Sequence, residues 1–180
     1  MKDEQGEWKV FFSSKKSVLF LLFLAIISSV LYVIYLEHMN QLPNEYLEKY
    51  LDRVDLSWSL DSFLAIFFTY FKRYLLVWLF GLVTFMIPIG IVLTYIYIFS
   101  YGFSVSWLYV ALGIKGMAQA GLVFGAQGII MIGCLLFLLD GILRKIRVFE
   151  EETLAKYSFL LLIGCIGCVV ITSLEMILNT

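Results

Sequence analysis

The sequence predicts an all-α integral membrane protein: a polytopic helical bundle that forms one membrane domain over residues 1–180, with about five transmembrane helices. Composition is the first observation, because 62% of the residues are hydrophobic and only 15% are charged. These values lie outside the range of soluble globular domains and fit a chain that crosses the membrane several times. The formal net charge of −1 provides no basic surface for nucleic acid, which is therefore not expected as a partner.

The second observation is a long uncharged run over residues 75–112. One helix of that length would be about 57 Å long, whereas the hydrocarbon core of a bilayer is about 30 Å thick. Tilt alone does not absorb that difference, so we expect a hairpin with spans near residues 74–92 and 93–112. Pro88, followed by a glycine two positions later, favours a turn there, because proline cannot continue a helix. A turn nearer Thr94 would divide the run more evenly and stays open.

The first span is expected near residues 17–36, an uncharged stretch of the length that crosses a bilayer. A polar stretch over residues 1–16 precedes it. We do not expect a cleaved signal peptide, because the apolar run exceeds a typical signal core and no small-residue cleavage site follows.

Residues 37–73 are predicted to form an external amphipathic segment. Residues 44–54 place apolar and aromatic side chains at helical spacing, as in a short helix that lies on the membrane surface or packs on its own bundle. The Asp-Ser pair at 61–62 would cap an aromatic interfacial helix over residues 63–73. The two cations that end this helix would reach the lipid headgroups.

The span near residues 117–139 is rich in small residues three or four positions apart, which let helices approach closely. It is predicted to be the central helix of the bundle, with Gly121, Gly125 and Gly128 along one groove. Gln127 would lie beside that groove. An amide within the membrane needs a partner, which is either another helix of this chain or a second protein.

The last span is expected near residues 158–178, which makes five. With the N-terminus cytoplasmic and the C-terminus external, most cations lie on the cytoplasmic side, in agreement with the positive-inside rule. Treating residues 75–112 as one span would move a basic cluster outside and invert the balance. The cytoplasmic cations are then Lys2, Lys9, Lys15, Lys16, Arg144, Lys145, Arg147 and Lys156.

No constellation of nucleophile, base or metal ligands is recognisable in the sequence, so catalysis, a cofactor and a metal site are not expected. Cys165 and Cys168 have CxxC spacing. On a membrane helix without a nearby histidine or acid, they are predicted to pack as small residues; a redox or metal site is the alternative. His38 alone makes no metal site.

Several loose motifs follow one another between residues 63 and 139. They are Phe67-Phe68, Trp78-Leu79-Phe80-Gly81, Ile87-Pro88-Ile89-Gly90, Gly102-Phe103-Ser104-Val105-Ser106-Trp107, Leu112-Gly113-Ile114-Lys115-Gly116 and Ala126-Gln127-Gly128. This order resembles the stage II sporulation protein M family. Ser106 and Ala126 stand where that family has Gly and Pro, which indicates a divergent member.

The resemblance implies a non-enzymatic, multi-pass protein of the bacterial cell membrane. It would act as a scaffold that anchors or regulates other membrane proteins, such as cell-wall hydrolases, and it is compatible with a homo-oligomer. Relatives of the family also occur alongside transport ATPases. The alternative is therefore a permease-like subunit of an ATP-driven (ABC-type) exporter of peptides or lipids, with an ATPase subunit docked on residues 141–157. The residues expected at partner interfaces are Gly102, Gly113, Lys115, Gly116, Gly121, Gly125, Gln127 and Gly128.

Overall fold

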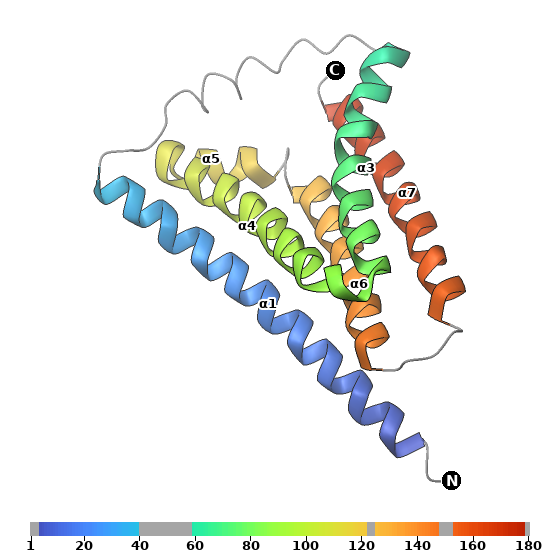
Figure 1. The fold of residues 1–180 in the computed structure, drawn as a ribbon. Coiled ribbons are helices and arrows are strands. Elements are labelled where there is room, and N and C mark those ends of the chain that lie inside the picture. Colours follow the sequence, from blue (N-terminus) through green and yellow to red (C-terminus); the bar gives the residue numbers. More distant parts are fainter. Residues whose placement is uncertain (1–3, 40–58, 122–124, 148–152, 179–180) are drawn as a thin grey trace.

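The computed structural model describes residues 4–39, 59–121, 125–147 and 153–178, and the regular structure in these ranges is entirely helical. Four of the helices are long and apolar enough to cross a membrane, so the predicted all-helical fold with membrane-length helices is confirmed. The elements in Figure 1 are α1 (Glu4–His38), α3 (Leu60–Leu82), a short 3-10 helix η2 (Thr84–Met86), α4 (Ile87–Leu112), α5 (Ile114–Ala120), α6 (Ala126–Arg147) and α7 (Thr153–Leu178).

The long helices alternate in direction between two ends of the molecule (Figure 1). α1, α4 and α7 run towards the upper end of the view, and α3 and α6 run towards the lower end. The start of α1 and the end of α7 therefore lie at opposite ends of the molecule. Which end faces the cytoplasm stays a prediction.

The uncharged run folds back as a hairpin, but its turn comes earlier than expected. α3 ends at Leu82 and α4 begins at Ile87, with η2 between them and a hydrogen bond from the amide of Met86 to the carbonyl of Val83 (2.9 Å). Pro88 lies in the first turn of α4. A proline there fits, because the first amides of a helix have no intrahelical partner. The predicted turn at Pro88 is therefore wrong, and the predicted spans 74–92 and 93–112 do not match the bounds of α3 and α4.

The helix before the turn is also longer than expected, because α3 begins at Leu60 and continues without a break to Leu82. Ser59 is its N-cap, and the Ser59 hydroxyl accepts a hydrogen bond from the amide of Ser62 (3.1 Å). The predicted cap at 61–62 and the separate interfacial helix over 63–73 are thus corrected to one helix of about 34 Å. The amphipathic helix predicted over 44–54 lies outside the described residues.

The predicted span over 117–139 is divided. α5 ends at Ala120 and α6 begins at Ala126, and Gly121 and Gly125 in between are π-helical. The apolar part of α6, Gln127–Leu143, is shorter than in the other four helices and would extend about 26 Å. That length is at the lower limit for a span, so the fifth crossing stays a prediction.

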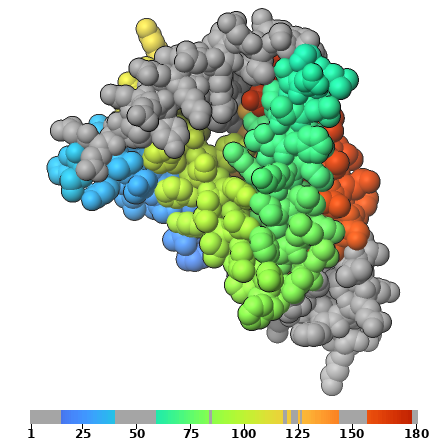
Figure 2. Space-filling model, turned by 45° about the horizontal axis from the view of Figure 1, so that its top comes forward, coloured from blue at the N-terminus to red at the C-terminus, as the bar shows by residue number. Residues whose placement is uncertain are grey.

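Two apolar clusters hold the helices together. The larger joins α3, α4, α6 and α7 around Tyr74, Met131 and Ile171, all at most 1% exposed. The smaller joins α1, α4 and α5 around Trp107. Figure 2 shows α3 and α4 side by side, with α7 alongside α3. α1 contacts mainly α4, and many apolar side chains on its other sides are exposed, as expected for a helix surrounded by lipid.

Single cysteines at the helix ends are expected to report the crossings of the hairpin. Leu60, Phe85 and Ile114 are 75%, 86% and 83% exposed, so a thiol at each accepts a label readily. In a variant without the native cysteines, Leu60→Cys and Ile114→Cys should react with a membrane-impermeant maleimide from one side of the membrane. Phe85→Cys should react only from the other side. Reaction of all three from the same side would contradict a hairpin that crosses twice.

Candidate functional site

Polar side chains from four helices meet inside the bundle. The hydroxyl of Tyr70 on α3 lies 2.8 Å from Oε2 of Glu175 on α7 and 3.3 Å from Oε1 of Gln127 on α6. Glu175 and Gln127 are both buried, at 8% and 2% exposure. Tyr101 on α4 is close enough to interact electrostatically with Tyr70 and Glu175. These four residues are called the polar cluster.

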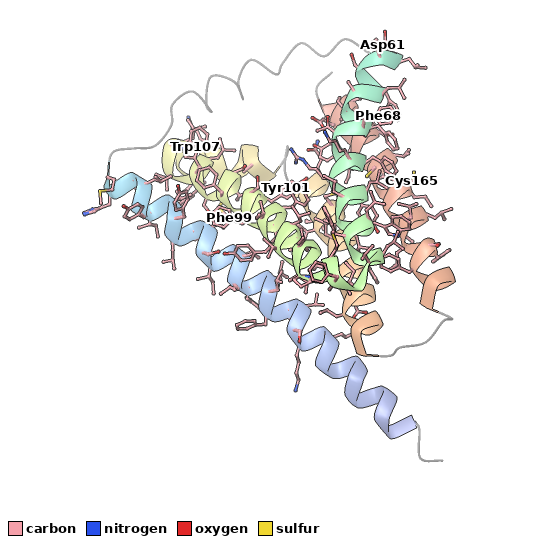
Figure 3. The ribbon with its side chains drawn as sticks, viewed as in Figure 1. Asp61, Phe68, Phe99, Tyr101, Trp107 and Cys165 are labelled. Carbon is pink, nitrogen blue, oxygen red and sulfur yellow. The ribbon has the colours of Figure 1, made fainter. Side chains whose placement is uncertain are left out.

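The four residues of the polar cluster lie at a similar height along the bundle, although they come from different parts of their helices. Tyr70 is ten residues beyond the start of α3, about 15 Å along a helix of about 34 Å. Gln127 is the second residue of α6, and Glu175 lies in the last turn of α7. Figure 3 shows Tyr101 on the middle part of α4, well away from Asp61 at the tip of α3. The cluster is therefore built where α6 begins and α7 ends, against the middle of α3.

Two cations lie near the cluster in the sequence of α3. Lys72 and Arg73 follow Tyr70 by two and three residues, so they are mid-helix and not at a helix end, where they were predicted. Both are exposed, and Arg73 interacts electrostatically with Tyr97 and Tyr101 on α4. A charged side chain at the centre of a membrane-spanning helix costs about 2.5–3.5 kcal/mol or more, and such residues commonly mark functional sites.

The Tyr70 hydroxyl lies near two acceptors of the cluster. The Tyr70 hydroxyl has one hydrogen, so it cannot donate to both Glu175 and Gln127 at once. Oε2 of Glu175, at 2.8 Å, is the closer of the two acceptors, and Oε1 of Gln127 lies at 3.3 Å.

One polar atom of the cluster, Nε2 of Gln127, is fully buried and has no hydrogen-bond partner within the described part of the chain. The buried Tyr101 hydroxyl instead interacts with the side chain of Arg73. The oxygen and nitrogen of the Gln127 amide can be exchanged by a flip of the side chain. In either orientation, one of these two atoms has no hydrogen-bond partner among the described residues. Buried polar groups normally find partners, so the cluster has capacity for one more hydrogen-bonding group.

The residues predicted for partner interfaces lie in different places. Gly128 is in the cluster region, because a Cβ there would be 3.4 Å from the ring of Tyr101. Gly102 lies on α4 against Ser29 of α1, where a Cβ would come within 3.2 Å of the Ser29 Cβ. The predicted set therefore does not form one site.

The Leu-Gly-x-Lys-Gly connection serves the junction of α4 and α5. Gly113 has a φ of 62°, which favours glycine, and its amide donates to the carbonyl of Tyr109 (2.8 Å) to end α4. A Cβ at Gly116 would collide with the carbonyl oxygen of Leu108, so α5 packs directly on the backbone of α4. Lys115 is exposed between them. A partner at these residues stays a prediction.

Gly121 and Gly125 do not mediate packing between the described helices. A Cβ at either position would have no heavy atom within 4 Å among the described residues. The single groove predicted along one helix over residues 117–139 is therefore wrong, since Gly121 and Gly125 each lie outside α5 and α6, and of the three glycines only Gly128 lies on α6.

A second polar contact, between α3 and the start of α7, was not predicted. The rings of Trp78 and Tyr157 stack, Trp78 Nε1 donates to the carbonyl of Tyr157 (3.1 Å), and the Tyr157 hydroxyl donates to the carbonyl of Trp78 (2.8 Å). Gly81 makes room for that hydroxyl. This gives the Trp78-x-x-Gly81 motif a packing role in this chain.

Among the residues that the structure describes, no group of three or more His, Cys, Asp or Glu side chains could hold a metal ion. Cys134, Cys165 and Cys168 are free thiols. Comparison of the chain with family models, with curated proteins and with solved structures gives no match in any of the three.

Proposed function

We propose that this chain is a non-enzymatic scaffold of the bacterial cell membrane, resembling stage II sporulation protein M, that anchors or regulates partner membrane proteins or cell-wall-remodelling proteins such as cell-wall hydrolases. The observation that carries the proposal is the set of small and polar residues around the start of α6. Among the described residues, no heavy atom lies within 4 Å of a Cβ built at Gly121 or Gly125, and the buried Gln127 amide near them has a nitrogen without a hydrogen-bond partner. Small residues and a polar atom are what a second helix needs for close approach in lipid.

A photo-crosslinking experiment tests the scaffold. A photoreactive amino acid at position 121 or 125 is expected to capture a protein partner in intact membranes, identified by mass spectrometry as a wall-remodelling protein or its membrane anchor. The matched control is the same amino acid at Gly133 on α6, which is also open but has no polar atom like that of Gln127 nearby in sequence. Capture of no protein, or equal capture from 133, would contradict the scaffold.

A second candidate function is a permease-like subunit of an ATP-driven exporter. The polar cluster favours it, because ionisable groups within a membrane bundle frequently mark transport pathways. Under this proposal an ATPase co-purifies with the chain, and Glu175→Gln lowers substrate-stimulated ATP hydrolysis while the complex still assembles. An ATPase activity unaffected by Glu175→Gln, or the absence of any ATPase from the complex, counts against export.

A further inference from the structure

α1 and α4 are in close contact only along part of their length. Near the upper end, Gly102 of α4 lies against Ser29 of α1, and the ring of Tyr32 contacts those of Phe99 and Phe103 at centroid distances of 5.9 and 6.0 Å. A hydrogen bond between the Ser28 and Tyr95 hydroxyls (2.6 Å) ends this contact. Towards the start of α1 the two helices leave a groove between them.

The groove has a volume of about 500 Å³, within the range of small-molecule sites. One end is polar and carries Lys16, and the other end is closed by Tyr95. Its walls are otherwise apolar, and they remain open to the surroundings because Phe20, Leu24 and Val92 are 68%, 48% and 54% exposed. The residues that line it are Lys16, Ser17, Phe20, Leu21, Leu24, Ile91, Val92 and Tyr95.

We propose that this groove binds one anionic phospholipid, with an acyl chain along the groove and the phosphate at Lys16. The position of Lys16 supports the phosphate, because Lys16 directly precedes the uncharged run of residues 17–36 and would lie near the headgroups if α1 crosses the membrane. A lysine at that depth attracts anionic headgroups, which are enriched in the cytoplasmic leaflet. The predicted orientation places this end of α1 on the cytoplasmic side.

The dimensions favour a lipid chain over a protein helix. Lys16 and Leu24 are eight residues apart on α1, about 12 Å along the axis. A helix with side chains is about 10–12 Å wide and would have to continue across the bilayer. The Ser28–Tyr95 hydrogen bond and the contact at Gly102 close that path, whereas a single acyl chain can end there.

Native mass spectrometry of the full chain in detergent tests the site. Phosphatidylglycerol and phosphatidylcholine with identical acyl chains are titrated separately, and the wild type is expected to retain one phosphatidylglycerol in preference. Lys16→Gln should weaken that binding about fivefold, the effect of one cation beside an anionic lipid. Val92→Trp and Leu24→Trp, each of which fills the groove, should reduce it to the detergent background.

Matched controls separate this site from ordinary lipid contact. Leu19→Trp adds the same side chain to α1 at a half-exposed position that does not line the groove, and Lys115→Gln removes a cation elsewhere. Both should bind phosphatidylglycerol as the wild type does. Equal retention of the two lipids, or loss in the controls as well, would overturn the proposal. A different result would also overturn it: the groove-filling variants disrupt a dimer on size-exclusion chromatography but still retain the lipid. In that case a second copy of the chain, and not a lipid, would occupy the groove.

Discussion

Gly164→Ala is expected to lower the melting temperature of the detergent-solubilised protein by about 2–12 °C. A Cβ at Gly164 on α7 would overlap the ring of Tyr74 on α3. Tyr74 cannot move aside freely, because it is fully buried and its hydroxyl donates to the carbonyl of Leu160 (2.7 Å). Overpacking of this kind costs about 1–3 kcal/mol, and a chain of this size loses about 2–4 °C per kcal/mol.

The matched control is Gly133→Ala on α6. A Cβ there has no heavy atom within 4 Å among the described residues, so it removes no contact of the described helices. Alanine also has a helix propensity about 1 kcal/mol better than glycine, so the melting temperature should stay the same or rise. Fluorescence-detected thermal unfolding measures both variants. Similar shifts for the two glycines would show that the contact between Gly164 and Tyr74 does not hold α3 against α7.

The hairpin shows which part of the fold the sequence could predict. The length of the uncharged run against the bilayer thickness required it to fold back, and α3 and α4 do so. The position of the turn was not predictable from Pro88, because proline breaks a helix interior but fits its first turn equally well. The local sequence is compatible both with a turn at Pro88 and with a helix that begins just before it. In the structure α4 begins before Pro88, and α3 packs against α4 and α7.

The polar cluster could be predicted from the sequence only in part. Gln127 was singled out because an amide within a membrane span needs a partner, and the structure provides Tyr70 as that partner. Tyr70 and Tyr101 carried no signal of their own in a chain with eleven tyrosines. Arg73 was assigned to a membrane interface, since cations usually mark helix ends there. Only the continuous course of α3 through this segment places it mid-helix.

The second large effect is expected in the polar cluster itself. Tyr70→Phe removes the hydroxyl that bonds to Glu175 and leaves the buried carboxyl group without its donor. An unsatisfied buried polar group costs about 1–3 kcal/mol, and a charged one costs more. Tyr109→Phe is the control, because Tyr109 is 53% exposed on α4 and should change little. Reversible unfolding in mixed micelles gives the free energy of unfolding for each variant.

A double-mutant cycle then separates the bond between Tyr70 and Glu175 from the two side chains that make it. Replacing both partners by apolar residues can be nearly neutral, because no polar group is left unpaired. Tyr70→Phe combined with Glu175→Leu should therefore be more stable than Tyr70→Phe alone. We expect a coupling energy close to the upper limit for membrane hydrogen bonds, about 1.7 kcal/mol. Strictly additive effects would mean that the two side chains do not interact in the folded protein. If the double variant folds but no longer complements a deletion strain, the polar cluster is required for function and not only for stability.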